Sequence, residues 1–240
     1  MTTLLALQTT LQTLANPQKK QILQRFFKTN KGDYAENDIF LGITVPEQRK
    51  LIKQFYTLPL HDIETLLQNN IHEYRFCALV LLIDRYQKGD DQLKKIVFNL
   101  YLKYSNSWVN NWDLVDISAP QIVGDFIFNY GGDKILEKLA NASNLWQRRI
   151  SIISTFYFIR QYYFDKTLQL SEQLLCDQHD LIHKACGWML REVGKRNEML
   201  LLDFLEKHHQ IMPRTMLRYS IEKLSPDQKK HFLKRNTLTG

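Results

Sequence analysis

The sequence is poor in the residues that build disulfide frameworks, tight turns and membrane spans. Of its 240 residues, 3 are Cys, 9 are Gly and 6 are Pro. Three cysteines (Cys77, Cys176 and Cys186) cannot form a dense disulfide framework, so we expect a reducing compartment. So few Gly and Pro argue against an all-β protein, which needs many tight turns. The longest uninterrupted apolar run, residues 76–83, is far shorter than the roughly 20 residues of a membrane span.

The sequence also lacks the marks of a secreted or disordered chain. Residues 1–15 are rich in Leu but carry no basic segment before the apolar residues, which makes them a poor signal peptide. Apolar residues make up 44% of the chain, which is ample for a packed core. We therefore expect a soluble, cytoplasmic protein that has no contact with a membrane.

Acidic residues are in deficit, and the deficit is uneven along the chain. Lys and Arg number 32 against 25 Asp and Glu, which gives a net charge of +7. Residues 180–240 hold 12 basic residues against 7 acidic ones, so most of the surplus lies there. Leu, Phe, Trp and Met recur at helical spacing through the same region, which predicts a folded basic face instead of a disordered tail. A face of this kind suits a polyanionic partner.

Helical periodicity runs through almost the whole chain, and no alternating strand pattern is convincing. Several of the expected helices begin at Pro, while Asn16 and Asp91 precede others as suitable N-caps. Residues 30–38 are the exception, a polar loop without an apolar period. The expected helices are Pro17–Lys28, Pro46–Tyr56, His61–Leu67, Glu73–Tyr86, Gln92–Tyr104, Pro120–Tyr130, Ile135–Ala140, Leu145–Tyr163, Lys166–Leu175, Leu181–Lys195, Glu198–His208, Pro213–Leu224 and Pro226–Lys234.

Charged residues recur at the start of comparable apolar helices, at steps of 38, 36, 35 and 34 residues. This period predicts an all-α HEAT-like superhelix, an α-solenoid that forms a single repeat domain over residues 1–240. An irregular helical bundle is the alternative. In a solenoid the repeated charges would line a concave face that could follow a phosphate backbone. The recurring residues are Arg75, Asp113, Arg149, Lys184 and Arg218.

Two segments stand out against this repeat. In residues 108–116, Trp112 and Asp116 are four apart and therefore lie one turn from each other on one helix face. In residues 184–192, Gly187 precedes Trp188 inside an otherwise good helix, which indicates close packing or close approach of a ligand. Taken alone, each Trp is more often a core anchor, and an Asp near a helix start is more often a cap.

At these segments the chain resembles the AlkD family of DNA alkylation repair glycosylases. The resemblance spans most of the chain and depends on motifs in a fixed order. They are Phe40-Leu-Gly-Ile-Thr-Val-Pro-Glu, Trp112-Asp-Leu-Val-Asp116, Trp146-Gln-Arg-Arg149 and Lys184-Ala-Cys-Gly-Trp-Met-Leu-Arg-Glu192. It implies a monomeric, monofunctional glycosylase that excises 3-methyladenine and 7-methylguanine from duplex DNA. It implies no cofactor, and no insertion of the base into a tight pocket.

The resemblance also assigns residues to roles. Trp112 and Trp188 match aromatic residues that flank the backbone of the lesion nucleotide, and Asp116 matches the catalytic carboxylate between them. Arg149 or its neighbour Arg148 matches an arginine that braces the DNA. No contact from the first repeat carries over, although Phe26 or Phe27 could face the groove. The repeated positions add Lys184, Arg75 and Arg218 as candidate DNA contacts. The candidate site therefore consists of three catalytic candidates and five candidate DNA contacts: Asp116, Trp112 and Trp188, and Arg149, Arg148, Lys184, Arg75 and Arg218.

The residue types suit this chemistry. Alkylation gives the purine a positive charge, so the base already leaves readily. A carboxylate can stabilise the cationic sugar that develops as the bond breaks, or it can orient the attacking water. Indole faces can add roughly 0.5–2 kcal/mol each beside a cation.

Three alternatives remain at this point. A non-catalytic protein that binds DNA structure, or a protein-interaction scaffold, would use the same repeats without the reaction.

The third alternative is a metal site, because a Cys-x2-His-x3-His-x2-Cys pattern resembles a zinc site. Because it spans a helix junction and enters an apolar face, we interpret it as structural. Its residues are Cys176, His179, His183 and Cys186.

Overall fold

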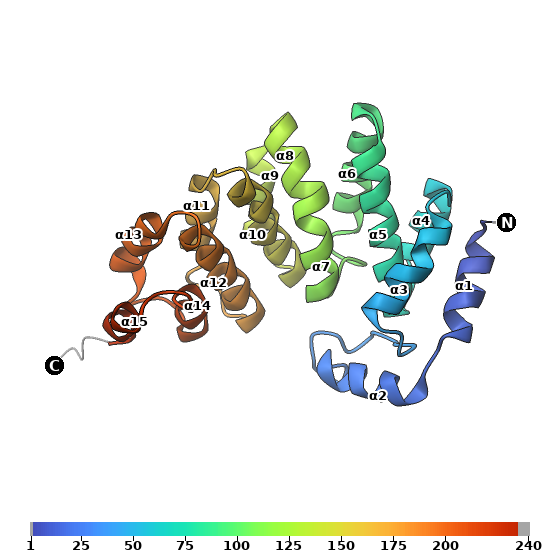
Figure 1. Cartoon of the computed structure of the whole chain (residues 1–240), viewed down its shortest axis with the longest axis horizontal. Helices are drawn as coiled ribbons and strands as arrows, with labels where there is room; N and C mark the ends of the chain where they lie inside the picture. The colour runs from blue at the N-terminus through green and yellow to red at the C-terminus, as the bar shows by residue number, and fades with distance from the viewer. Residues whose placement is uncertain (1, 235–240) are drawn as a thin grey trace. The chain divides into compact units, whose positions relative to one another are not determined.

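A computed structural model describes residues 2–234, and the secondary structure elements of these residues are helices (Figure 1). The only β-type pairing among these residues is an isolated bridge between Ile39 and Ile71. The chain divides into two compact units, Met1–Ser118 and Ala119–Gly240. The all-helical class is thereby confirmed. The HEAT-like superhelix, its concave face and the single repeat domain stay predictions.

The first unit contains the helices that carry the N-terminal half of the candidate site. Its helices are α1 (Leu4–Thr13), α2 (Pro17–Phe26), α3 (Val45–Ile52), the 3-10 turn η1 (Lys53–Phe55), α4 (Leu60–Leu67), α5 (His72–Lys88), α6 (Asp91–Tyr104) and α7 (Trp112–Ala119), the last residue of which belongs to the second unit.

The second unit continues with η2 (Pro120–Gly124), a π-helical turn, and then with further α-helices. These are α8 (Asp125–Tyr130), α9 (Asp133–Ala140), α10 (Leu145–Arg160), α11 (Asp165–Gln173), α12 (Asp180–Gly194), α13 (Glu198–His208), α14 (Arg214–Ser220) and α15 (Pro226–Leu233).

The helix ends follow their capping residues. The Asn16 side chain accepts hydrogen bonds from the backbone N–H groups of Gln18 (3.0 Å) and Lys19 (2.9 Å), as an N-cap does. At α6 the cap is Asp90, which accepts from Leu93 N at 2.8 Å, so the expected cap at Asp91 was wrong by one residue. The helix expected to begin at Pro120 begins earlier, because α7 (Trp112–Ala119) continues without a break into η2 and α8. Pro120, which has no backbone N–H, lies at the first position of the π-helical turn.

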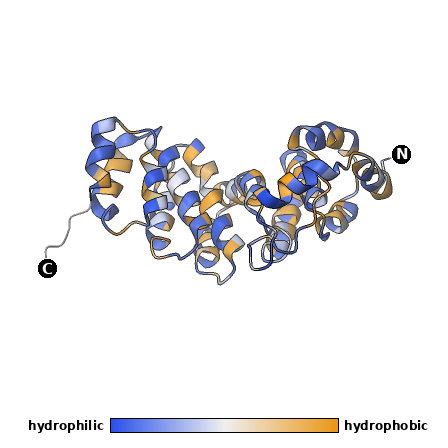
Figure 2. Cartoon of the chain, turned by 90° about the horizontal axis from the view of Figure 1, so that it is seen from below, coloured by the Kyte–Doolittle hydropathy of each residue, from blue (hydrophilic) through white to orange (hydrophobic). Residues whose placement is uncertain are grey.

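Each unit has its own apolar core, and hydrophobic and hydrophilic residues are interspersed along the individual helices (Figure 2). Within the second unit, α12 packs against α10 and α14, and within the first unit, α5 packs against α4 and α6. Representative fully buried side chains are Leu11, Ile52, Leu66 and Leu79 in the first unit and Ile150, Ile153, Met189 and Leu217 in the second. None of the helices in residues 2–234 is both long enough and apolar enough to span a membrane.

The loop over residues 30–38 ends in a fixed position. Ile39 N donates to Asn70 O (3.0 Å), and His72 N donates to Ile39 O (2.8 Å). These bonds join the end of the loop to the start of α5 and bury Asp38. The prediction of a polar, non-helical loop is confirmed, and its last residue belongs to the interior.

Candidate functional site

Helix α7 presents Trp112 and Asp116 from its first two turns. Asn111 precedes the helix: its backbone carbonyl accepts from Val115 N (3.1 Å), and its side-chain oxygen accepts from Trp112 N (2.8 Å). Trp112 and Asp116 are both half-buried. The predicted spacing of one helical turn between indole and carboxylate is therefore present, with both groups reachable from solvent.

Aromatic rings hold Trp112 in place. Phe27 stacks on it, with ring centroids 5.2 Å apart and planes 14° apart, and Phe26 meets it edge-on at 5.8 Å. Phe27 is buried and stacks in turn on Phe40 at 5.0 Å, whereas Phe26 is 62% exposed. Of the two phenylalanines, Phe27 therefore belongs to the interior and Phe26 to the surface beside Trp112.

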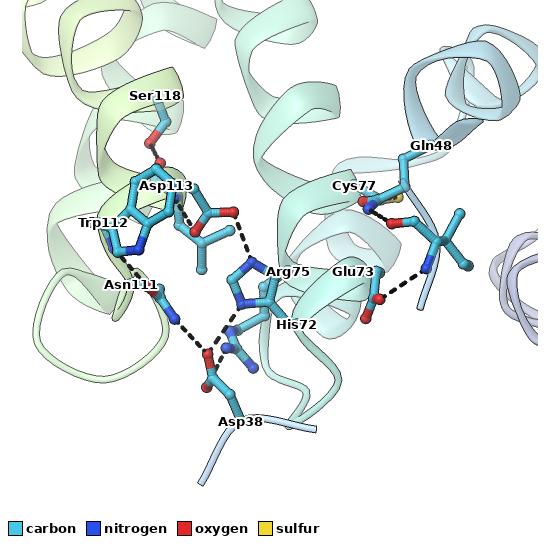
Figure 3. Close-up of polar contacts among 12 residues, drawn as sticks. Asp38, Gln48, His72, Glu73, Arg75, Cys77, Asn111, Trp112, Asp113 and Ser118 are labelled. Atoms are coloured by element: carbon cyan, nitrogen blue, oxygen red, sulfur yellow. Dashed lines mark hydrogen bonds and ion pairs between the residues drawn. The ribbon is translucent and has the colours of Figure 1, made fainter. Parts of the chain in front are cut away.

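A buried group of polar and charged residues, which we call the His72 network, lies next to Trp112 (Figure 3). His72 bridges two carboxylates: its Nδ1 lies 3.0 Å from Asp38 Oδ2, and its Nε2 lies 2.8 Å from Asp113 Oδ2. Arg75 Nη2 donates to the second oxygen of Asp38 (2.5 Å), and Asn111 Nδ2 donates to Asp38 Oδ2 (2.9 Å). The network thus joins the end of the 30–38 loop, the start of α5 and the start of α7.

The network favours a charged imidazole. Burial favours the neutral ring, but the charge of Asp113 and the hydrogen bonds to Asp113 and Asp38 outweigh it and raise the pKa of His72 from 6.5 to about 9. Burial also works against the charge of Asp38, yet the hydrogen bond from His72 and the charge of Arg75 hold the pKa of Asp38 below its usual value. At neutral pH the network therefore contains two cations and two anions.

The two carboxylates at the start of α7 have different surroundings. Asp113 is engaged by His72, and its other oxygen accepts from Leu114 N (2.9 Å). Asp116 lies near the buried phenol of Tyr101: burial raises the pKa of Tyr101, a hydrogen bond with Ser118 lowers it, and the charge of Asp116 raises it further. Asp113 therefore belongs to the His72 network, and the charge of Asp116 acts on Tyr101.

Arg75 has a structural role that differs from the predicted one. It is 1% exposed, its Nη2 pairs with Asp38, and its Nη1 donates to Asn69 O (2.8 Å). A DNA phosphate has no access to a guanidinium buried in this way. Burial therefore removes Arg75 from the candidate DNA contacts.

Arg148 repeats the contacts of Arg75. Each arginine donates to the carbonyl six residues earlier in the chain, which is Ala142 O (3.0 Å) for Arg148, and each pairs with an aspartate. The partner of Arg148 is Asp177, with Nε 2.6 Å from Oδ2. Both arginines thus fasten the first turn of a helix to the chain segments around it.

Arg149 lies one residue further on and is only 4% exposed. Its Nη1 donates to Leu181 O (2.5 Å), a carbonyl in the first turn of α12. In this structure Arg149 therefore ties α10 to α12, and its contact with DNA stays a prediction.

Trp188 projects from the middle of α12. Its ring lies 5.7 Å from that of Phe156 on α10, and it is half-buried. A Cβ added to the preceding Gly187 would lie 2.5 Å from both Met216 O and the Cβ of Tyr219. Gly187 is therefore explained by the close packing of α12 on α14, which is one of its two predicted roles.

The remaining predicted cations are accessible. Lys184 is half-buried and pairs with Asp180 one turn earlier (2.7 Å), and Arg218 is exposed on α14. Among the described residues, no group of three or more His, Cys, Asp or Glu side chains is arranged to hold a metal ion. In the pattern that resembled a zinc site, Cys186 is buried and Cys176 is exposed.

The predicted residues fall into both units. Trp112 and Asp116 lie in the first, and Trp188, Arg148, Arg149, Lys184 and Arg218 lie in the second. Sequence reasoning did not single out His72 or Asp38, and it named Phe27 only as one of two phenylalanines that could face the groove. One signal for His72 was available: residues 72–75 place a His, a Glu and an Arg directly before the apolar run at 76–83.

These observations define an all-helical protein whose candidate site pairs a tryptophan with a carboxylate one helical turn away. The family model of DNA alkylation repair enzymes matches residues 7–224, and the chain belongs to this family. A solved structure described as a predicted DNA alkylation repair enzyme from Enterococcus faecalis is similar in fold. It has a TM-score of 0.68 and 20% sequence identity, over 88% of this chain and 97% of the other. No curated protein matches the sequence.

Proposed function

We propose that this protein is a monofunctional DNA glycosylase that hydrolyses the N-glycosidic bond of cationic N-alkylated purines, such as 3-methyladenine and 7-methylguanine, in duplex DNA. Family membership supports a role in DNA alkylation repair. The observation that carries the specific reaction is the start of α7. There Asp116 stands one turn from Trp112, while the neighbouring carboxylate of Asp113 is engaged by His72.

DNA binding is the first step of the proposal. The helices form a HEAT-like superhelix whose concave face receives the duplex, without insertion of the base into a tight pocket. The net charge of +7 supports an anionic partner. Lys184 and Arg218 are the accessible candidates for phosphate contacts, and Arg149, with its neighbour Arg148, would contact phosphate only after giving up present partners.

Bond cleavage is the second step. The C1′–N bond breaks with both electrons leaving on the purine, which cancels the positive charge of the base. The carboxylate of Asp116 stabilises the cationic sugar and orients a water molecule, which adds to C1′ and gives up one proton to that carboxylate. The faces of Trp112 and Trp188 stabilise the same cation through their ring quadrupoles. The alkylated base needs no acid to leave, so one carboxylate suffices.

The test is release of base from methylated duplex DNA under single-turnover conditions. Asp116→Asn keeps the shape of the side chain and removes its charge, so we expect the rate constant to fall by about 10²–10³-fold. Asp203→Asn on α13 is the matched control, because it removes the same charge from an exposed position and should keep the wild-type rate.

Three outcomes would contradict the proposal. An Asp116→Asn variant with the wild-type rate would exclude the mechanism. Salt-sensitive binding of DNA by a wild-type protein that releases no base would favour the non-catalytic binder, and absence of DNA binding would favour a scaffold.

A further inference from the structure

We propose that His72 is a positioning residue for this reaction: it acts as a buried cation between Asp38 and Asp113 and fixes Trp112 at the start of α7. The catalytic part of this inference rests on the proposed function. The positioning part can be tested without any base release.

The geometry around the ring requires two donors. Each ring nitrogen of His72 faces a carboxylate oxygen, at 3.0 Å on Asp38 and at 2.8 Å on Asp113. A neutral imidazole has one N–H, so one carboxylate would then face a lone pair. Only the imidazolium donates to both carboxylates at once. The bridge between the 30–38 loop and α7 therefore depends on the proton.

His72 reaches Trp112 through the residues on both sides of it. Asp113, the residue after Trp112, accepts directly from His72. Asn111, the residue before Trp112, donates to the same oxygen of Asp38 that faces His72, and its own oxygen accepts from Trp112 N. Trp112 thus lies between Asp113, a direct partner of the imidazolium, and Asn111, which is linked to the imidazolium through Asp38.

The rings complete the connection. His72 stacks on Phe40, with centroids 4.6 Å apart and planes 20° apart, and lies 4.9 Å from Phe27. Phe27 is the ring that stacks on Trp112. A shift of the imidazole would therefore disturb both the backbone and the ring contacts of Trp112.

The charges that face His72 come from three chain segments. Asp38 in the loop and Asp113 on α7 favour its proton, and Arg75 on α5 opposes it. Glu73, the next residue of α5, directs its carboxylate to the backbone N–H groups of Leu41, Gly42 and Ile43 instead. Loss of the His72 proton would leave two carboxylates with Arg75 as the one cation of the network. Because the pKa of His72 is raised to about 9, we expect the positioning to hold at neutral pH and to fail as the pH rises through that value.

The experiment compares His72→Gln with Glu73→Gln. Both variants alter a buried side chain at neighbouring positions of α5, but only His72 belongs to the network beside Trp112. Base release is followed under single-turnover conditions from pH 6.5 to 9.5, with a control without enzyme at each pH, since alkylated purines also leave spontaneously. In parallel, ¹⁹F NMR of protein labelled with 5-fluorotryptophan reports each tryptophan, and the Trp112 signal is assigned by its loss in Trp112→Phe.

We expect His72→Gln to lower the single-turnover rate constant by about tenfold, because misplacement of a reacting group is costly, with half-saturation by DNA within about twofold. The Trp112 signal should move, those of Trp146 and Trp188 should stay, and the decline of the wild-type rate toward pH 9 should disappear. Glu73→Gln should lower thermal stability without moving the Trp112 signal or the pH profile.

His72→Gln with the wild-type rate, Trp112 signal and pH profile would overturn the inference. If His72→Gln does not fold, the wild-type protein still decides: the Trp112 signal either follows the titration of the His72 imidazole, or it does not and the inference fails. If no protein releases base while the Trp112 signal responds to His72, the proposed function fails and the positioning stands.

Discussion

The two candidate tryptophans are held in different ways. Trp112, in the first unit, is covered by Phe27, and its backbone depends on a buried network that collects residues from three distant parts of the chain. Trp188, in the second unit, contacts Phe156 and follows a glycine packed on α14. Two tryptophans predicted for the same role are thus positioned in different ways, Trp112 by buried charged groups and Trp188 by backbone packing.

The largest expected difference concerns stability. Phe27→Ala removes a buried ring that touches Trp112, Phe40 and His72, so we expect a loss of about 3–5 kcal/mol in the free energy of unfolding. Phe156→Ala removes a half-buried ring and should cost less than about 2 kcal/mol. Chemical denaturation measures the free energy of unfolding of both variants. Equal losses in the two variants would contradict the view that Trp112 and Trp188 are held in different ways.

The next difference is in pH dependence. The folded-state pKa of His72 is raised from 6.5 to about 9, so its stabilising contribution is complete below pH 6.5 and is lost as the pH rises through about 9. This contribution is on the order of 3 kcal/mol at most. Denaturation at a series of pH values should show the decline in wild type and a flatter profile in His72→Gln. The same decline of stability in both proteins would show that this pH dependence does not come from His72.

A smaller effect is expected on the reaction itself. Trp112→Ala and Trp188→Ala should each slow base release by about 2- to 30-fold, which corresponds to roughly 0.5–2 kcal/mol for an indole beside a cation. In a His72→Gln background, Trp112→Ala should add little, because its ring is already displaced. Trp188→Ala should keep its full effect. If the effects of Trp112→Ala and Trp188→Ala were both fully additive with that of His72→Gln, His72 would not act through Trp112.

The smallest effect concerns DNA affinity. Lys184→Gln and Arg218→Gln each remove an accessible cation, so each should reduce the slope of log K against log salt by about 0.9 if it contacts a phosphate. Arg75→Gln removes a cation that is buried, and it should leave the slope unchanged in protein that is still folded. Titrations of duplex DNA at several salt concentrations provide the measurement. A reduced slope for folded Arg75→Gln would mean that Arg75 reaches DNA.

The all-helical class and most of the helices could be predicted from local sequence signals. The cap at Asn16 and the helix over Glu198–His208 depend on neighbouring residues and match the structure. The Trp112–Asp116 spacing on one helix was equally local. Where local signals compete, the observed helix ends differ from the predicted ones. The helix expected over residues 213–224 is in fact the shorter helix Arg214–Ser220.

The His72 network could not be predicted in this way. Its bonds join residues that are 34, 37, 41 and 73 positions apart, and only the folded chain brings them together. For the same reason Arg75 was assigned to a surface. Its repeat position was visible in the sequence, but its partner Asp38 lies in a loop without periodicity.

Helix α2 directly precedes Phe27, the ring that covers Trp112, so its attachment affects how readily the indole is uncovered. None of the residues 17–26 is buried, and contacts with the rest of the unit lie on either side of the helix. At its start, Asn16 N donates to Leu41 O, and a Cβ at Gly42 would lie 2.2 Å from Asn16 O; just past its end is Phe27. A helix without core anchors opens locally at far lower free energy than the unit unfolds. Phe27, the ring that covers Trp112, thus follows directly on a helix that has no buried residue, so local opening of α2 would loosen the cover of the indole face.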